Sequence, residues 1–381
     1  MGAHAANDEQ AVSEAASRRR GKVAPRRRHE KASDSAVRKP QAPCGRMRGV
    51  GLHLVAALAL GAAALAACGS SDRLAPAAEP ARSPPLERDP AGTVVPIGHR
   101  PEGLAFDPVT GLLAVGLTNP DRLALVDGDT GRTVRRVPLP ESPRHLKLAA
   151  AGGPVLVPAE RADAIAAVSL PAGQVRSTDV GRFPHDAVRA RGRLFVGDEL
   201  GHTLSVVEGD RRIEALPAPR QPGGVAATTD RRHVGVIGVR ERALEVFDTK
   251  TLESEGEVSV GIGPTHVVGG GTRFFVVDTR GGALLEVRLD PLRVHRRTHL
   301  GGTPYGIVLD PERRRYWVTL TAHNQVAELT DRRVLRHFPT VRQPNSVAVD
   351  SSTGRVFVAS RLDGTLQFFD PRPCRGDACD R

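Results

Sequence analysis

The sequence lacks the short motifs that mark several large enzyme classes. No Gly-x-Ser-x-Gly elbow, phosphate-binding loop, His-Glu-x-x-His or Cys-x-x-Cys pair occurs in its 381 residues. Serine hydrolase, nucleotide-binding and zinc-ribbon functions therefore lack parts that they need. Aromatic residues are scarce at 3%, whereas glycine (40) and proline (30) are abundant. Because Gly and Pro break helices and punctuate strands, this mixture favours many short strands over a helical bundle.

Lysine is also scarce, with five residues against a total of 54 Lys and Arg, which we ascribe to a GC-rich coding sequence. The net charge of +11 raises the question of a nucleic-acid partner. Residues 1–67 hold 12 Lys and Arg against 5 Asp and Glu, whereas the remaining chain holds 42 against 38. Most of the basicity lies in the leader, so we do not expect nucleic-acid binding.

The one long apolar run, residues 49–67, follows Arg46 and Arg48 and ends directly at Cys68. This layout is typical of a secretory signal. The end of the run, Leu-Ala-Ala-Cys68, resembles the lipobox of bacterial lipoproteins, which implies that Cys68 is lipidated and begins the mature chain. An uncleaved signal anchor and an ordinary cleaved signal are the alternatives. We expect an extracytoplasmic domain anchored to the bacterial cell membrane.

The regions flanking this signal are polar. Met47 begins a well-proportioned signal peptide, 47–67, so residues 1–46 are interpreted as a mis-annotated or disordered extension, with Met1 or Met47 as the true start. Residues 68–92 are rich in Pro and Ala and are expected to be a lipid-anchored tether. In the tail, 372–381, Cys374 and Cys379 are expected to form a small disulfide loop; the enclosed Arg-Gly-Asp is too short to indicate adhesion.

A repeat of about forty residues dominates the rest of the chain. Each repeat begins with a proline followed by an apolar stretch, then a turn, a second apolar run, a polar loop, an alternating third run and a more polar fourth run. Short apolar runs bounded by Gly, Asp and Pro are strands. The repeats begin at Pro101, Pro143, Pro184, Pro222, Pro264, Pro304 and Pro344, at intervals of 38 to 42 residues.

Four strands repeated seven times predict an all-β fold, a seven-bladed β-propeller with four antiparallel strands per blade, over residues 93–371. The seventh repeat contains only three strands, and an unpaired strand at 93–97 precedes the first repeat. We therefore expect the N-terminal strand to complete the last blade and close the ring.

The repeats resemble the YncE-like, YVTN-repeat family of propellers. The resemblance rests on Trp317-Val-Thr319, Phe357-Val-Ala-Ser360 and Leu125-Val-Asp-Gly-Asp-Thr-Gly131, which match the second and third strands of the family's repeat in part. It covers residues 93–371 and implies the fold, but not the chemistry, because propellers host many functions. DNA binding within the family would need more positive charge than the mature chain carries.

Residues at equivalent positions of successive blades meet around the central channel, where imidazoles and carboxylates could bind a divalent metal or do acid–base work. We expect His145, His185 and His266 to converge there with Asp198 or Asp278. Polar rings without chemistry are common in propellers, so we assign no catalytic residue, metal or cofactor, with a divalent cation as the alternative. The candidate channel-face residues are His145, His185, His266, Glu160, Asp198, Asp278, Arg240, Tyr305 and Asn345.

The sequence leaves two main functional hypotheses. The first is a non-enzymatic, monomeric binding module that presents its loop face to a protein, glycan or small ligand. The second is a lactonase-like or lyase-like enzyme that uses channel His, Glu and Arg with a divalent cation. Convergence of the three histidines with a carboxylate beside them, within about 5 Å of a shared point, would favour the enzyme.

Overall fold

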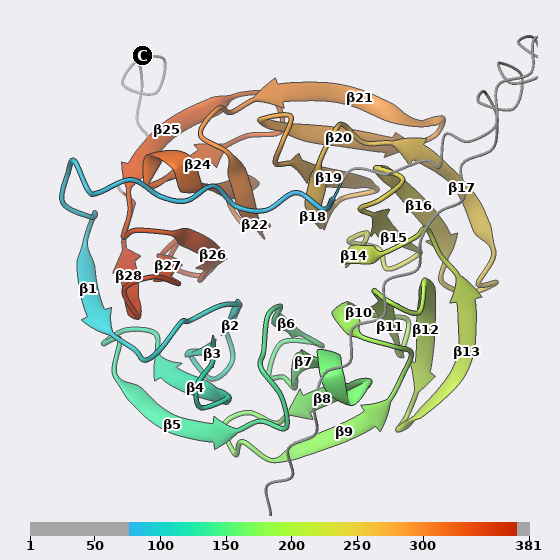
Figure 1. The fold of residues 1–381 in the computed structure, drawn as a ribbon, viewed down its shortest axis with the longest axis horizontal. Helices are drawn as coiled ribbons and strands as arrows, with labels where there is room; N and C mark the ends of the chain where they lie inside the picture. Colours follow the sequence, from blue (N-terminus) through green and yellow to red (C-terminus); the bar gives the residue numbers. More distant parts are fainter. Residues whose placement is uncertain (1–75, 372–381) are drawn as a thin grey trace, which may run out of the picture. The chain divides into compact units, whose positions relative to one another are not determined.

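The computed structural model describes residues 76–371, which form seven four-stranded antiparallel sheets arranged in a ring (Figure 1). The extension at 1–46, the signal at 47–67, Cys68 and the Cys374 and Cys379 pair lie outside the described residues. Within the described part, no helix is long and apolar enough to span a membrane. The predicted fold class, a seven-bladed β-propeller, is confirmed.

Each blade runs from an inner strand at the channel to an outer strand at the rim. Blades one to three consist of β2 (Leu104–Asp107), β3 (Leu112–Leu117), β4 (Arg122–Asp127) and β5 (Thr133–Pro138); β6 (Lys147–Leu148), β7 (Val155–Ala159), β8 (Ala164–Val168) and β9 (Val175–Asp179); β10 (Pro184–Ala190), β11 (Arg193–Asp198), β12 (Thr203–Glu208) and β13 (Arg211–Pro217).

Blades four to seven continue this order, and two short 3-10 helices, η1 (Glu160–Ala162) and η2 (Thr321–His323), lie in blades two and six. The strands of blades four to seven are β14 (Pro222–Ala227), β15 (His233–Gly238), β16 (Ala243–Asp248) and β17 (Ser254–Ser259); β18 (Pro264–Gly270), β19 (Arg273–Asp278), β20 (Ala283–Leu289) and β21 (Leu292–His299); β22 (Pro304–Asp310), β23 (Arg315–Leu320), β24 (Gln325–Leu329) and β25 (Val334–Pro339); β26 (Pro344–Val349), β27 (Val356–Ser360), β28 (Thr365–Phe369) and β1 (Thr93–Pro96).

The ring closes through the N-terminal strand. β1 pairs antiparallel with β28, with Thr93 opposite Phe368 and Val95 opposite Leu366, so blade seven has its fourth strand. Without β1, strand β28 would be an unpaired edge, and unpaired edges of this kind favour aggregation. The expected role of the N-terminal strand is therefore confirmed.

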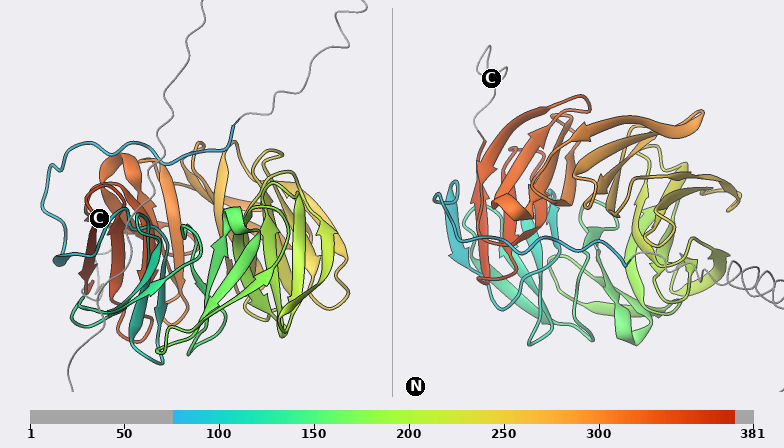
Figure 2. Two further views of the ribbon diagram at one scale, coloured as in Figure 1. Left: turned by 60° about the horizontal axis from the view of Figure 1, so that its bottom comes forward. Right: turned by 45° about the horizontal axis from the view of Figure 1, so that its top comes forward.

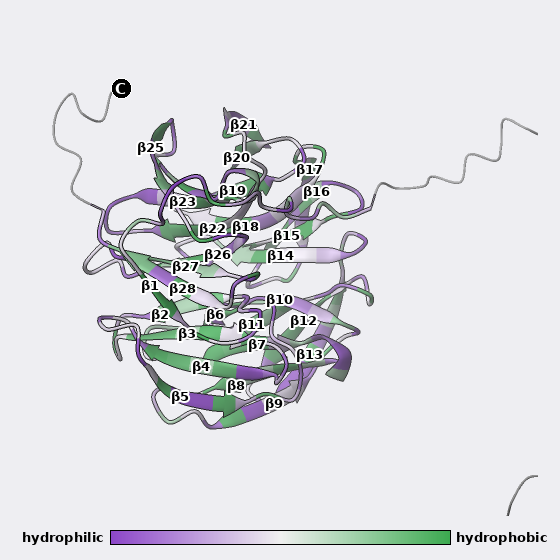
Figure 3. Ribbon diagram, turned by 60° about the vertical axis from the view of Figure 1, so that its left-hand side comes forward, coloured by the Kyte–Doolittle hydropathy of each residue, from purple (hydrophilic) through white to green (hydrophobic). Residues whose placement is uncertain are grey.

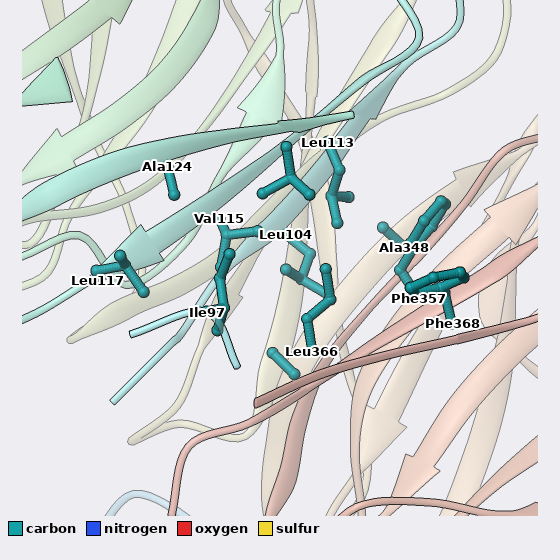
Figure 4. Close-up of a cluster of buried hydrophobic side chains, with 12 residues drawn as sticks. Ile97, Leu104, Leu113, Val115, Leu117, Ala124, Ala348, Phe357, Leu366 and Phe368 are labelled. Atoms are coloured by element: carbon teal, nitrogen blue, oxygen red, sulfur yellow. The ribbon is translucent and has the colours of Figure 1, made fainter. Parts of the chain in front are cut away.

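Hydrophobic side chains between adjacent blades form the core. At the junction of blades seven and one, Ile97, Leu113 and Val115 pack with Phe357 and Leu366, and each is at most 1% exposed (Figure 4). The outer strands are polar: β13 has no fully buried residue, and polar colour gathers on β5, β9 and β13 (Figure 3). This gradient from apolar to polar strands reflects which strands are packed on both faces.

Asp-initiated turns join the first two strands of several blades. In blade one, Asp107 Oδ2 accepts hydrogen bonds from the backbone N–H (3.0 Å) and hydroxyl (2.6 Å) of Thr110. The turn ends at Gly111, whose φ of +67° lies in the left-handed region that glycine adopts without strain. Asp350 in blade seven begins a similar turn, in which it accepts from the N–H of Ser352 and the hydroxyl of Thr353.

Residues 76–92 do not extend freely away from the ring. They cross one face of the propeller before entering β1, as Figure 2 shows for the chain in blue. Ala78 and Ser83 are 8% and 5% exposed, although the sequence led us to expect a spacer with nothing to bury. Hydrogen bonds to the segment's backbone and to Ser83, rather than apolar side chains, hold it in place. Its role as a membrane tether stays a prediction.

Candidate functional site

Three histidines and a tyrosine meet at the mouth of the central channel. His145 precedes β6, His185 and His266 lie near the starts of β10 and β18, and Tyr305 lies near the start of β22. The ring of His145 lies between the other two histidines, with its centroid 4.5 Å from that of His185 and 5.1 Å from that of His266. Tyr305 meets His266 edge-on at 4.6 Å.

Blade four makes this convergence geometrically possible. His145 and His266 stand on blades two and five, yet the intervening blades do not separate their rings. The inner strand of blade four carries Gly223 and Gly224 at the equivalent place, and a Cβ on Gly224 would lie 3.2 Å from both Thr265 O and Val267 Cγ1. Because glycine has no side chain, β14 and β18 approach closely and leave the channel mouth to the histidines.

Two carboxylates fix the orientation of His185. Its Nδ1 lies 3.1 Å from Glu160 Oε1, at the start of η1, and 3.1 Å from Glu199 Oε2, which follows β11. Glu199 is held in turn by Gln221, whose Nε2 donates to Glu199 Oε1 at 2.7 Å. Arg144 Nη1 lies 3.6 Å from Glu160 Oε1. A carboxylate–imidazole pair of this kind orients the ring and favours its protonated form.

The environment separates the proton affinities of the three imidazoles. Burial disfavours charge on His185, but its hydrogen bond to Glu160 and the nearby carboxylate of Glu199 outweigh burial and raise its pKa. Burial, reinforced by the charges of His185 and His266, holds the pKa of His145 well below its usual value. Burial together with His185 lowers the pKa of His266 to about 3. Neighbouring groups with divergent pKa values are the arrangement that acid–base sites use.

Small cavities open on both sides of the histidines. One of about 80 Å³ lies within the channel and another of about 70 Å³ lies beneath residues 77–79, and both are bordered by Arg144, His145, His266 and Tyr305. The channel cavity also has apolar walls from Leu104, Leu146 and Val347. The site therefore combines a few polar groups with apolar walls, as small-molecule sites do.

Lys147 anchors the histidine-bearing loop from below, a role that sequence reasoning missed. Its Nζ donates to Asp186 Oδ2 at 2.6 Å and to the carbonyl of Val225. Asp186 Oδ2 also accepts from the N–H of Val225 at 2.8 Å, so one carboxylate joins three blades. The available signal was a lysine on an inner strand, two residues after His145, in a chain that has only five lysines.

Asp198 and Asp278 do not join the histidines. Each is fully buried at the end of a second strand and caps its own loop. Asp198 Oδ2 accepts from the hydroxyls of Thr203 and Ser205 at 2.7 Å, and Asp278 Oδ1 accepts from the N–H of Gly263 at 2.9 Å. Both carboxylates are committed to satisfying polar groups of their own blades. The carboxylates that contact His185 are instead those of Glu160, at the start of η1, and Glu199, directly after β11.

The remaining candidates lie near the site. Arg240 Nε donates to Gln221 Oε1 at 2.7 Å, so Arg240 supports Glu199 indirectly. Asn345 borders the channel cavity, and its Oδ1 accepts from Gln343 Nε2 at 3.2 Å. The structure thus brings the predicted channel-face residues together at the channel mouth, except for Asp198 and Asp278. The site also includes Arg144, Glu199, Gln221 and Lys147, which were not among the predicted residues.

A divalent cation could in principle use part of this set. The nearest ligand atoms of Glu160, His185 and Glu199 lie within 4.8 Å of one another. A cation there would compete with the proton of His185 and with the charge of Arg144. A second group, His233, Asp248 and Glu255, has the same spacing but lies on β15, β16 and the outer strand β17, away from the channel.

Comparisons with known proteins establish the fold alone. No protein-family model and no curated protein sequence matches the chain. Hydrazine synthase of Kuenenia stuttgartiensis superposes with a TM-score of 0.63 at 13% identity, over 77% of this chain and 99% of that one. Virginiamycin B lyase from Staphylococcus aureus gives 0.62 at 14%, over 72% and 97%. A chain of the mitotic checkpoint complex gives 0.65 at 12%, over 77% and 96%.

Proposed function

We propose that the channel mouth binds a small molecule and acts on it by acid–base chemistry, as in a lyase or lactonase. The observation that carries this proposal is the contact of His145 with both His185 and His266 around one cavity, with two carboxylates 3.1 Å from His185. Paired acid and base groups within reach of one cavity are what elimination or ester opening requires.

The residues divide into distinct roles. His185, held protonated between Glu160 and Glu199, is the proton donor to a leaving group. His145, neutral and in contact with His185, is the proton acceptor. Arg144 lies beside Glu160 and supplies positive charge for an oxyanion that develops in the cavity beneath residues 77–79, which His145 and His185 also border. Lys147 and Asp186 are positioning residues, because they act through the backbone that carries the histidines.

The similarity of fold gives this proposal a substrate class to test. One structure of virginiamycin B lyase, similar at 13% identity with a TM-score of 0.61, is a catalytically inactive variant with quinupristin. Together with the lactone- and ester-opening chemistry expected of the histidine cluster, this makes cyclic esters the first class to examine. Membership of the YncE-like family and an extracytoplasmic, lipid-anchored location form part of the same proposal, supported by the repeats and by the lipobox-like sequence at Cys68.

Purified protein should be assayed against simple lactones, chromogenic esters and quinupristin. We expect turnover of at least one class, and a fall of roughly 10²- to 10⁴-fold in kcat/KM for His185→Gln and for His145→Gln. The matched control is His337→Gln, because His337 is exposed on the outer strand β25 and remote from the cavity. Turnover that survives both channel substitutions would overturn the proposal.

A non-enzymatic binding module is the second candidate, and one observation favours it. The loop face already holds an extended segment, residues 76–84, through side chains that contact its backbone. If no compound is turned over but one binds saturably, and His185→Gln abolishes that binding in calorimetry, the binding module is the better description.

A further inference from the structure

Residues 76–84 cross the channel face as an extended segment held by side chains from blades five, six and seven. Arg280 of blade five donates from Nη2 to the carbonyl of Pro76 at 3.0 Å. Thr321 of blade six accepts from the N–H of Ala81 at 3.0 Å, and Asn324 donates to the carbonyl of Pro84 at 3.0 Å. Gln343 of blade seven donates to the carbonyl of Ala81 at 2.8 Å. The segment therefore bridges three blades (Figure 1).

Ser83 is the most tightly bound point of the segment. Its hydroxyl donates to the carbonyl of Thr321 at 2.6 Å and accepts from the N–H of Gln343 at 2.9 Å. Its own N–H donates to Gln343 Oε1 at 3.0 Å. The side chain is thus used as donor and acceptor and is buried, so its position is set by specific partners on the propeller.

The other end of the segment roofs the histidine cluster. Ala77, Ala78 and Glu79 border the same cavity of about 70 Å³ as His145, His185 and Tyr305. Ala78 packs over Gly263, where an added Cβ would lie 2.9 Å from the Cβ of Ala78. The carboxylate of Glu79 acts electrostatically on Arg144 and on Tyr305. Groups of the segment therefore face the groups to which we assign chemistry.

We propose that residues 76–84 are a strap that closes the channel mouth over the histidine cluster, so that a ligand enters from this face only when the strap lifts. The strap is suited to lifting because it buries few apolar side chains and is held mainly by hydrogen bonds. The net gain from such bonds is comparable to the conformational entropy lost on ordering the segment. The effect of the strap on turnover rests on the proposed function, whereas the closure of the channel mouth does not depend on it.

Chemical labelling of histidine tests the closure without any substrate. Diethyl pyrocarbonate reacts with unprotonated imidazole, and peptide mass spectrometry gives a rate for each histidine. Deleting residues 76–84 keeps β1, and should raise the labelling rate of His145 and His266, the two unprotonated imidazoles beside this cavity, by about tenfold, because access no longer requires local opening. His233 and His337, away from the channel mouth, are internal standards whose rates should not change.

Ser83→Ala decides the question if the deletion variant fails to fold. It removes the hydroxyl that links the strap to Thr321 and Gln343, and should raise the labelling rates at His145 and His266 as the deletion does, but to a smaller extent. The matched control is Ser177→Ala on the exposed outer strand β9. Unchanged labelling of His145 and His266 in the strap variants would overturn the proposal. Faster labelling in a protein that turns over no substrate would support the closure by the strap and would count only against the proposed enzymatic function.

Discussion

The imidazole rings of His145 and His266 lie 5.1 Å apart although they belong to blades two and five of the ring. The two glycines of blade four, Gly223 and Gly224, make the space for this contact because neither projects a side chain into the mouth. The channel mouth is therefore a packed cluster rather than a set of exposed loop residues, and substitutions next to it should affect both stability and chemistry.

Gly223→Ala should destabilise the protein, since its Cβ would lie 2.9 Å from Val239 Cγ1. We expect a loss of about 1–3 kcal/mol in urea unfolding from this overpacking. Val239→Ala removes the opposing methyl, so the double variant should lose less than the sum of the two single changes. Strictly additive losses would show that this contact does not limit the packing of blade four.

His266 should make stability depend on pH below neutrality. Its pKa is about 3 in the folded protein, because burial disfavours the charged ring, against about 6.5 when exposed. Between these values the unfolded chain binds a proton that the folded protein does not, so stability falls as pH falls, by up to about 1.4 kcal/mol per pH unit. Subtracting the unfolding curve of His266→Gln from that of the wild type isolates this term; parallel curves from pH 6.5 to 4 would contradict it.

Removal of β1 should open the ring. A variant that begins after Ile97 lacks the partner of β28 and the buried side chain of Ile97, so we expect a lower melting temperature and concentration-dependent association. A variant that begins at Ala91 is the control, because it lacks the strap but keeps β1. Light scattering and thermal melting give the comparison, and a shorter variant that stays monomeric with the wild-type melting temperature would refute closure.

Added Mg²⁺, Mn²⁺ or Zn²⁺ should not raise the melting temperature. Arg144 and the proton of His185 already compensate the carboxylates of Glu160 and Glu199, which leaves little binding energy for a cation. Glu255→Gln should be measured in parallel, since it disables the second cluster around His233. A metal-dependent rise that persists in Glu255→Gln but is lost when His145, His185 and His266 are replaced by Ala would contradict this expectation and indicate a metal site at the histidine cluster.

Cys68 should carry lipid in the mature protein. The run that ends in Leu-Ala-Ala-Cys68 predicts diacylglycerol on its sulfur, and Cys68→Ala should release the chain or leave the precursor uncleaved. Mass spectrometry of the N-terminal peptide from the membrane fraction measures this directly. Unmodified Cys68 in membrane-bound protein would favour an uncleaved signal anchor instead.

The sequence by itself determined the blades. Local signals suffice for this, because each repeat carries its own proline, turn and short apolar strands, and because the strand count requires residues 93–97 to complete the seventh blade. The convergence of the three histidines was expected from their places near the repeat prolines, with His145 and His266 two residues after the proline and His185 one residue after it. Periodicity thus predicts which residues share a face.

Only the tertiary structure decided which carboxylates face the histidines and what covers them. Asp198 and Glu199 are neighbours in sequence, but Asp198 turns inward to cap its own blade, whereas Glu199 reaches His185. Likewise, residues 76–84 carry the composition of a free linker, yet Ser83 finds partners about 240 and 260 residues away. Such contacts depend on the packing of blade six against blade seven, which brings Thr321 and Gln343 to one face, and they have no local signature in the chain.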